Sequence, residues 1–346
     1  MPNHPSFSLK SSGVDLRSGT GCQVLPIAST AFDLYARIRS SDSEFGLPGS
    51  EDYLKLSTLC KEEFSWSIGD VMFSDCFITN GSQREFSEAI SSGKIAVLAT
   101  DVHPDNGRYV EIPVEFDGLP NMIEAGVILS DPDVKVLSLS HVNRTTGVIC
   151  PLADLKRISA KRQVLHVDVS HSHGVMPVDC TGADYITLDC NGINGPSGVG
   201  ICWSSTHTLP FPEHLASIEF LAALKEALLI SRKGLGGASS LAELADVVAN
   251  NVYAHRNCEV LCSSVKSRSK RHVCFSIPEG SADRLSQMKT SFGINFDHPI
   301  PEDSMKTLSA MGIEDFDKYV VVVVDRLTVR ANVRHFVNAF NSSMPL

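Results

Sequence analysis

The sequence predicts an α/β protein whose central sheet is mostly parallel. Apolar stretches of strand length at 76–79, 95–100 and 134–139 alternate with segments in which apolar residues recur at helical spacing. This alternation is typical of parallel strands joined by crossover helices that cover both faces of the sheet. Ligands of such sheets bind beyond the carboxyl ends of the strands. We therefore expect the polar residues at these ends to form any binding site.

Composition excludes several classes of protein. The chain has 346 residues, 43% of them hydrophobic, which is enough to bury one large core and a smaller one. Thirty basic and forty acidic side chains give a formal charge of −10, which argues against a nucleic-acid partner. No run of about 18 apolar residues is present to span a membrane. The ten cysteines form no C-x-x-C pair, which indicates buried thiols in a reducing, intracellular compartment, with cytoplasm and mitochondrion both open.

A Gly- and Ser-rich segment at 234–239 marks the best domain boundary, directly after a long helix predicted at 212–232. We therefore expect an N-terminal arm (1–13), a large domain (14–233) and a small C-terminal α+β domain (234–346). The arm is polar and lacks the apolar segment of a secretory signal. In the small domain we expect helices at 242–255, 281–288, 305–308 and 329–341, and strands at 273–277, 291–295 and 319–324.

The clearest helix start lies at Ser50. Its hydroxyl is suited to cap the helix, Glu51 favours the positive end of the helix dipole, and apolar residues recur at helical spacing from Tyr53 to Cys60. An earlier helical pattern covers 31–38. Both helices belong to the predicted large domain.

The stretch from Leu165 to Trp203 reads as a strand ending at Asp168, a turn, a second strand, and a Gly- and Pro-rich loop at 195–200 that leads into a third strand. It resembles the cofactor-binding centre of the class V aminotransferase and cysteine desulfurase family, in which the pattern runs from H-V-D to S-x-H-K-x-x-G-P-x-G. The resemblance implies the type I fold of transferases that depend on pyridoxal phosphate (PLP), with a smaller C-terminal domain. It also implies a dimer with the pocket at the subunit interface, and a setting in sulfur metabolism.

The S-x-H-K element of the family does not survive. Its positions read Asp189, Cys190, Asn191 and Gly192, so a glycine stands where the resemblance implies the Schiff-base lysine. A Schiff base needs an amine side chain. Asp189 also places a carboxylate where the family holds the cofactor phosphate, and two negative charges about 4 Å apart repel by about 1 to 4 kcal/mol. We therefore expect no catalytic residue and no bound cofactor, with non-covalent PLP as the alternative.

Two further departures concern the desulfurase reaction itself. The loop that carries the family's nucleophilic cysteine corresponds to 291–296, and it contains no cysteine. The arginine that binds the substrate carboxylate in the family falls near Val321, which offers no hydrogen bond to an anion. The sequence thus lacks the residues for sulfur transfer and for substrate binding as well as for the Schiff base.

The resemblance assigns a remnant pocket to seven residues, and the residues themselves leave alternatives open. Gly81 and Ser82 resemble the loop whose amides hold the phosphate at a helix start, or they form a plain strand-turn-helix junction. Asp168 corresponds to the partner of the pyridine nitrogen, or it caps the turn after its strand. The others are His103 at the ring-stacking position or in ordinary loop structure, Asn143 in a partly kept H-V-N motif, His171 in place of a glutamine, and Thr208 at the end of a shortened loop motif.

Three closely spaced histidines could in principle belong to a zinc site. His166, His171 and His173 surround Asp168, and histidine with a carboxylate can ligate zinc. His166 and Asp168, however, alternate along a strand, and no distant cluster of cysteine or histidine has ligand spacing. We therefore expect no metal.

A short basic run precedes the strand predicted at 273–277. It contains Lys266, Arg268, Lys270 and Arg271. Runs of this kind are typical of a solvated loop, and a partner surface is the alternative.

Three separate functions are lost at once in this sequence, namely the Schiff base, the sulfur nucleophile and the substrate clamp. We therefore expect a catalytically degenerate, desulfurase-like protein with a structural or regulatory role. Its expected partner is a protein, either a second copy of the chain or an active relative. The alternative is a PLP-binding desulfurase-like or aminotransferase-like enzyme with an atypical site, which the remnant pocket residues favour.

Overall fold

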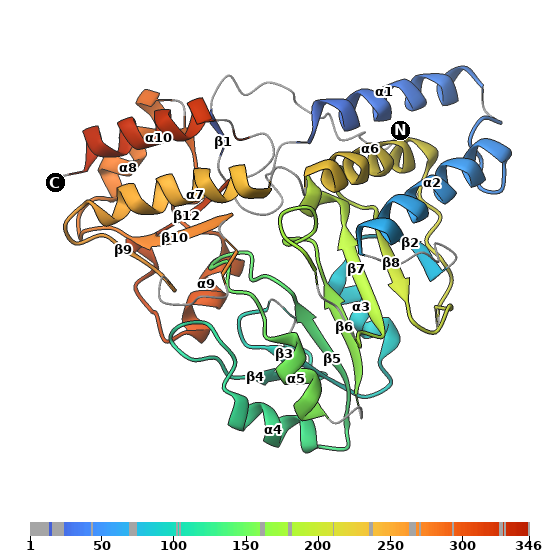
Figure 1. The fold of residues 1–346 in the computed structure, drawn as a ribbon, viewed down its shortest axis with the longest axis horizontal. Coiled ribbons are helices and arrows are strands. Elements are labelled where there is room, and N and C mark those ends of the chain that lie inside the picture. Colours follow the sequence, from blue (N-terminus) through green and yellow to red (C-terminus); the bar gives the residue numbers. More distant parts are fainter. Residues whose placement is uncertain are drawn as a thin grey trace.

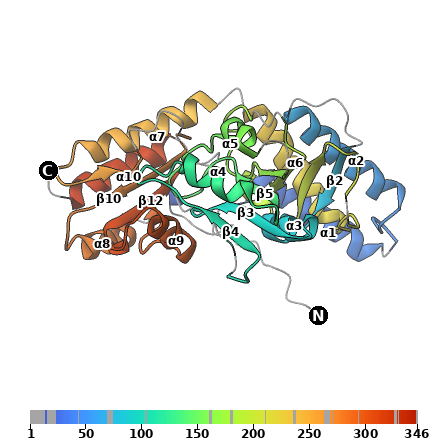
Figure 2. The same ribbon diagram turned by 90° about the horizontal axis from the view of Figure 1, so that it is seen from below.

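A computed structural model describes residues 24–344 apart from 43, 69–74, 102, 104, 160–162, 179–181, 210, 235–237, 263–267, 270, 293, 325–327 and 329, together with a short strand at 14–15. The predicted arm at 1–13 lies outside the described residues. Figures 1 and 2 show a larger part, coloured blue to yellow, beside a smaller part, coloured orange to red. The exact domain boundaries stay a prediction.

Seven strands form the sheet of the larger part, in the order β2-β8-β7-β6-β5-β3-β4. β8 is antiparallel to both of its neighbours, and all other neighbours in this sheet are parallel. The prediction of a mostly parallel sheet is confirmed, and the carboxyl ends of β2, β3, β5, β6 and β7 meet at one edge. The strands are β2 (Cys76–Thr79), β3 (Lys94–Leu98), β4 (Tyr109–Ile112), β5 (Val134–Ser140), β6 (Val164–Asp168), β7 (Tyr185–Asp189) and β8 (Gly200–Ser204).

Helices cover both faces of this sheet (Figure 2). Leu137 and Leu139 of β5 face a core that α1, α2, α4, α5 and α6 share. Val136, the residue before Leu137, faces the opposite side, where α3 packs, as the alternation of side chains along a strand requires. The helices are α1 (Pro26–Ser41), α2 (Glu51–Ser67), α3 (Gln83–Ile90), α4 (Met122–Ser130), α5 (Leu152–Ser159) and α6 (Ile218–Gly234).

The smaller part is built on an antiparallel sheet in the order β12-β10-β9. Stacked Phe336 and Phe340 pack α10 onto one face of it, and α9 covers the other face. The N-terminal strand β1 (Val14–Asp15) crosses to this part and pairs in parallel with β11. The elements are α7 (Ala238–Tyr253), β9 (Glu259–Val260), β10 (His272–Ser276), α8 (Ala282–Phe292), β11 (Ile294–Asn295), α9 (Glu302–Ala310), β12 (Tyr319–Val323) and α10 (Arg330–Ser343).

Local signals predicted most of these elements. The cap at Ser50 is confirmed, because its hydroxyl oxygen accepts a hydrogen bond from the amide of Tyr53 at 3.3 Å. The strands predicted at 76–79, 95–100 and 134–139 are present as β2, β3 and β5. None of the helices in the described part is long and apolar enough to cross a bilayer.

The predicted start of the long helix at 212 is wrong, because α6 begins only at Ile218. The preceding residues run beside β2 instead. The amide of Ile78 donates to the carboxylate of Glu213 at 2.6 Å, and the amide of His214 donates to the carbonyl of Ile78 at 3.0 Å. The segment thus satisfies the exposed edge of β2, and Leu215, which the helical pattern included, is 65% exposed.

The strand predicted at 291–295 is also too long. Residues 291 and 292 belong to α8, and β11 covers only Ile294–Asn295. Leu285, Met288 and Phe292 continue the helical spacing, so the helix extends one turn beyond its predicted end. β4 and α4 were not predicted from the sequence.

Candidate functional site

A pocket of about 420 Å³ opens at the carboxyl ends of the parallel strands. It lies between the loops after β2, β3, β5, β6 and β7 and the start of α9 in the smaller part. A larger hollow of about 560 Å³ lies beyond α3, between Phe86 and the segment 211–215, and its lining holds only three titratable side chains. The strand-end pocket gathers far more polar and charged groups, and it is therefore the candidate site.

The structure brings five of the seven sequence-assigned residues together in this pocket. Gly81, Ser82, Asn143, Asp168 and His171 line it, and so do Asp189, Asn191 and Gly192 from the segment after β7 that the resemblance compares with S-x-H-K. Their roles toward a ligand stay predictions. No lysine is among the described residues of the lining.

The other two assigned residues do not line the pocket. The His103 ring stacks on Tyr109 with 4.9 Å between ring centroids, and its Nε2 lies 2.9 Å from the Glu111 carboxylate on β4. Thr208 belongs to the turn after β8, where its carbonyl accepts a hydrogen bond from the Ser204 hydroxyl at 2.8 Å. Each of these two residues therefore makes its contacts within its own part of the chain and not in the pocket.

Gly192 stands where even a methyl group has no room. It lies in the short 3-10 helix η3 (Cys190–Ile193) that follows β7. An ideal Cβ at Gly192 lies 2.4 Å from the carbonyl oxygen of Ser170 and 2.7 Å from its Cβ, well inside van der Waals contact. The obstacle is backbone, which cannot rotate away as a side chain can. Any residue other than glycine at this position therefore requires the two loops to move apart.

Asp168 is held by the turn that follows β6. Its carboxylate accepts hydrogen bonds from the Ser170 amide at 3.2 Å, the Ser170 hydroxyl at 2.9 Å and the Thr187 hydroxyl at 3.2 Å. Thr187 in turn accepts from Nε2 of His166, whose Nδ1 accepts from Ser138, so His166 is a buried neutral link between strands. Burial lowers the pKa of His166 to about 3.

Three carboxyl groups with raised pKa values line the pocket. Burial raises the pKa of Asp168 to about 6 and that of Asp101 to about 6. Burial, together with the negative charge of Asp168, raises the pKa of Asp189 to about 7. These groups resist ionisation because each is desolvated and because they repel one another. A phosphate group bound among these three carboxyl groups would be repelled by them in the same way.

Asp189 lies against the loop that precedes α3. Gly81 has a φ of +79°, and an ideal Cβ there is 2.9 Å from Oδ1 of Asp189, so glycine is required for conformation and for space. The same Oδ1 accepts a hydrogen bond from the Asn191 amide at 3.0 Å. The Asp189 carboxyl group thus lies beside Gly81, in the loop that the resemblance identifies as the binding site for the cofactor phosphate.

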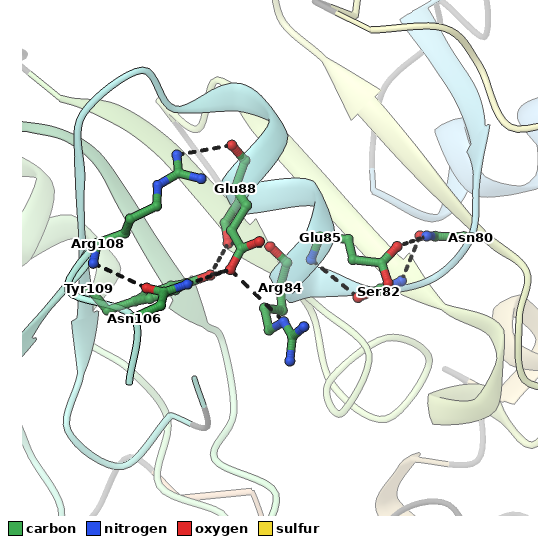
Figure 3. Close-up of polar contacts among 9 residues, drawn as sticks. Asn80, Ser82, Arg84, Glu85, Glu88, Asn106, Arg108 and Tyr109 are labelled. Carbon is green, nitrogen blue, oxygen red and sulfur yellow. Dashed lines mark hydrogen bonds and ion pairs between the residues drawn. The ribbon is translucent and has the colours of Figure 1, made fainter. Parts of the chain in front are cut away.

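The start of α3 supplies its own hydrogen-bond acceptors (Figure 3). The Ser82 hydroxyl oxygen accepts from the backbone amide of Glu85 at 3.2 Å, and the side-chain oxygen Oδ1 of Asn80 accepts from the backbone amide of Ser82 at 3.0 Å. The Asn80 amide group in turn donates to the Glu85 carboxylate. A helix start binds anions through amides that lack partners. Here two amides are already paired and a carboxylate lies beside them, as in an ordinary capped helix end.

The pocket contains residues that the sequence did not assign. Asp101 directly follows the strand predicted at 95–100, and its position at a strand end was the signal that could have identified it. Arg144 reaches Asp303 of α9 in an ion pair, which joins the pocket to the smaller part. Asp303 lies 159 residues further along the chain, so no local pattern predicts this contact.

The residues present do not fit PLP bound as a Schiff base. The described lining holds no lysine, Ser170 leaves no room for a side chain at Gly192, which the resemblance assigns to the lysine, and the neighbouring groups are carboxyls and capped amides. Nor does any group of three or more histidine, cysteine, aspartate or glutamate side chains within the described ranges have the arrangement of a metal site. The pocket is a polar cavity whose lining holds both carboxyl groups and the two arginines Arg84 and Arg144.

Comparison with protein families gives a match for the central segment of the chain. Residues 95–219 match the family described as Aminotransferase class-V. Over 73 residues the chain is 40% identical to cysteine desulfurase IscS 1 of Archaeoglobus fulgidus, which covers 20% of this chain and 19% of that protein. Over 95 residues it is 30% identical to the mitochondrial cysteine desulfurase of Candida albicans, covering 27% and 19% of the two chains. The matches thus span about a fifth of the length of these relatives.

Solved structures resemble the chain over nearly its whole length. A NifS-like protein from Rickettsia africae superposes with a TM-score of 0.80 at 16% identity, covering 95% of this chain and 99% of that one. Cysteine desulfurase CsdA of Escherichia coli gives a TM-score of 0.76 at 14% identity, covering 96% and 94%. At these identities the likeness shows the fold alone. The predicted type I fold, a mostly parallel seven-stranded sheet with a small C-terminal antiparallel sheet, is confirmed.

Proposed function

Because the chain is related, through residues 95–219, to the class V aminotransferase and cysteine desulfurase family, whose members use PLP, we propose that it is a member without catalytic activity. In this proposal the protein keeps the desulfurase fold as a structural or regulatory subunit. The observation that carries the proposal is the closed position at Gly192, where a side chain meets the Ser170 carbonyl at 2.4 Å.

The other two losses support the same proposal. Val321 lies fully buried in β12, opposite Cys274 of β10, in the apolar core that faces α9. An arginine at this register would have to enter that core, so the substrate clamp is absent together with the space for it. Cys274 is equally buried, and burial raises the pKa of its thiol well above its ordinary value, which makes it a poor nucleophile.

A structural role requires a partner. The resemblance implies a dimer, and we propose either a homodimer or a heterodimer with an active relative. The pocket would then lie near the second subunit. The proposed setting is intracellular, in the cytoplasm or the mitochondrion, and one relative that the chain matches is named as mitochondrial.

A desulfurase assay tests this proposal. The purified full-length protein is incubated with L-cysteine, PLP and a thiol reductant, and both sulfide and alanine are measured, with an active cysteine desulfurase as the positive control. We expect both products to stay at the level of the protein-free blank. Stoichiometric production of sulfide and alanine that co-elutes with the protein would refute the proposal.

A second candidate function is an enzyme that binds PLP without a Schiff base. It is favoured by the cavity of about 420 Å³, which keeps Asp168 and His171 in its lining. In that case PLP raises the melting temperature of the protein, and Asp168→Ala abolishes the increase. If PLP and phosphate leave the melting temperature unchanged, this candidate is excluded and the non-catalytic role remains.

A further inference from the structure

Three carboxyl groups, here called the carboxyl trio, reach the strand-end pocket from the ends of three strands. Asp101 follows β3, Asp168 ends β6 and Asp189 ends β7, and all three line the pocket. All are largely desolvated, and within the described ranges none of them forms an ion pair. Burial and nearby like charges both disfavour the charged form of a carboxyl group. Ionisation of the trio therefore costs free energy in the conformation that the structure describes.

The arginines of the described lining do not neutralise the carboxyl trio. Arg144 forms an ion pair with Asp303 at the start of α9. Nε of Arg84 lies 4.0 Å from the carboxylate of Glu88, one turn further along α3 (Figure 3). Each arginine is thus engaged with an acidic partner of its own.

The other titratable groups around the trio are neutral or have separate partners. Burial lowers the pKa of two imidazoles and raises the pKa of two thiols, so four groups are uncharged at neutral pH, namely His166, His171, Cys150 and Cys190. Glu85 adds a carboxylate to the lining and accepts from the side-chain amide of Asn80. His103, on the loop of Asp101, has its Nε2 2.9 Å from the Glu111 carboxylate.

Two members of the trio hold two loops in place, and one serine joins these loops. Asp168 accepts from the Ser170 amide at 3.2 Å and from the Ser170 hydroxyl at 2.9 Å, which fixes the turn after β6. The Ser170 hydroxyl oxygen in turn accepts from the backbone amide of Asp189 at 2.8 Å. Oδ1 of Asp189 accepts from the Asn191 amide at 3.0 Å, at the start of η3. Repulsion between Asp168 and Asp189 therefore acts across Ser170.

The turn after β6 and η3 are also in direct backbone contact. An ideal Cβ at Gly192 would lie 2.4 Å from the Ser170 carbonyl oxygen, so no side chain fills the space between the two loops. On its other side η3 is held by Arg271, whose Nη1 donates to the Gly192 carbonyl oxygen at 3.3 Å. Arg271 is only 4% exposed, so the expectation that it belongs to a solvated basic run is wrong. A small separation of the turn from η3 breaks these contacts and changes the pocket lining.

We propose that Asp101, Asp168 and Asp189 form a pH-sensitive switch, which separates the turn at 168–172 from η3 when the three carboxyl groups ionise together. When they are protonated, the turn and η3 pack as the structure shows. When they are ionised, their repulsion opens the contact across Ser170. The switch involves neither a Schiff base nor the lysine position, so it does not depend on whether the chain is catalytically active.

Proton linkage gives the direction and size of the effect. A carboxyl group whose pKa is higher in the closed than in the open conformation favours the closed conformation at low pH. Burial, together with Asp168, raises the pKa of Asp189 from 3.8 to about 7, so opening increases between these pH values and is nearly constant above them. Full return of this pKa to 3.8 on opening raises the opening constant about hundredfold from pH 5 to pH 8, and partial return still gives roughly tenfold.

The test is hydrogen exchange of the full-length wild-type protein, measured by mass spectrometry and corrected for the intrinsic effect of pH. We expect the opening constant of peptides that cover the turn at 168–172 and η3 to rise at least roughly tenfold from pH 5 to pH 8, and less than about twofold from pH 8 to pH 9. Peptides from β12 are the internal reference and should not change. Unchanged protection of the turn and η3 would overturn the proposal, and so would an equal rise in β12, since the whole chain would then be opening.

Two variants identify the groups that sense pH. Asp189→Asn should reduce the rise from pH 5 to pH 8 to about threefold or less, because the charge of Asp189 and its repulsion of Asp168 are both removed. His103→Gln is the matched control, because it removes an imidazole from the loop of Asp101 and should keep the full rise. A rise that Asp189→Asn retains, or that His103→Gln abolishes, would overturn the proposal. The results on the wild type do not depend on how either variant folds.

Discussion

Replacement of Asp189 by asparagine should stabilise the protein at alkaline pH. The asparagine side chain has nearly the same shape and keeps an oxygen that can accept from the Asn191 amide, as Oδ1 of Asp189 does at 3.0 Å. It removes only the charge. Burial and the neighbouring Asp168 raise the pKa of this carboxyl from 3.8 to about 7 in the folded protein. Ionisation of Asp189 is therefore unfavourable to the fold.

The sign and size of the effect follow from proton linkage. A carboxyl whose pKa is raised on folding holds its proton more tightly in the native state, so its penalty is absent below pH 3.8, grows up to about pH 7 and is constant above that. The full difference between the two pKa values corresponds to about 4 kcal/mol. Because Asp189 is only partly buried, solvent screening reduces the expected gain to about 2 kcal/mol at pH 8, and to less than 1 kcal/mol at pH 5.

Urea unfolding of the wild type and of Asp189→Asn at the two pH values measures this difference. Asp33→Asn is the matched control, because Asp33 is exposed on α1 and the same chemical change is made there. If Asp189→Asn is no more stable than the wild type at pH 8, ionisation of Asp189 does not destabilise the fold and the prediction is refuted. It is refuted equally if the gain is the same at both pH values, since the effect would then not arise from ionisation.

Three further substitutions test other parts of the structure. Gly192→Lys should not restore a Schiff base, and it should lower the urea midpoint, because a Cβ at this position lies 2.4 Å from the Ser170 carbonyl oxygen. A stable variant with a borohydride-reducible absorbance band would contradict this prediction. Ser50→Ala should lower the free energy of unfolding by about 1 kcal/mol through loss of the α2 cap, and an unchanged urea midpoint would show that the cap contributes nothing. His166→Ala leaves the buried Thr187 hydroxyl without its donor and opens a cavity, so the free energy of unfolding should fall by about 3 kcal/mol. A melting temperature near that of the wild type would show that the site collapses without cost.

Sequence patterns predicted what depends on neighbouring residues. The cap at Ser50 and the strands at 76–79 and 134–139 are determined by residues within a few positions of one another, and all are present. The start of α6 was mispredicted because the amide of Ile78 is satisfied by Glu213, a partner 135 positions away. Helical periodicity continues through 212–217 whether or not an open strand edge lies beside it.

The candidate site was only partly predictable for the same reason. The absence of a lysine at position 192 is visible in the sequence, but its closure by Ser170 requires the turn after β6 to pack against η3. The pair of Asp101 and Asp168 depends on the strand order that places β3 and β6 on either side of β5, because this order brings the two residues to the same pocket. Arg271 is bonded to a carbonyl 79 residues earlier, so its burial beside the pocket follows from the packing of the two parts alone.

We propose that this pocket cannot hold PLP as a Schiff base. The most direct measurement is the visible absorbance spectrum of the full-length protein purified in the presence of PLP, before and after borohydride reduction, followed by peptide mapping. The structure predicts no reducible aldimine band and no pyridoxyl-lysine in any peptide. A reducible band together with one lysine modified in stoichiometric amount would contradict the claim and would identify the residue that replaces position 192.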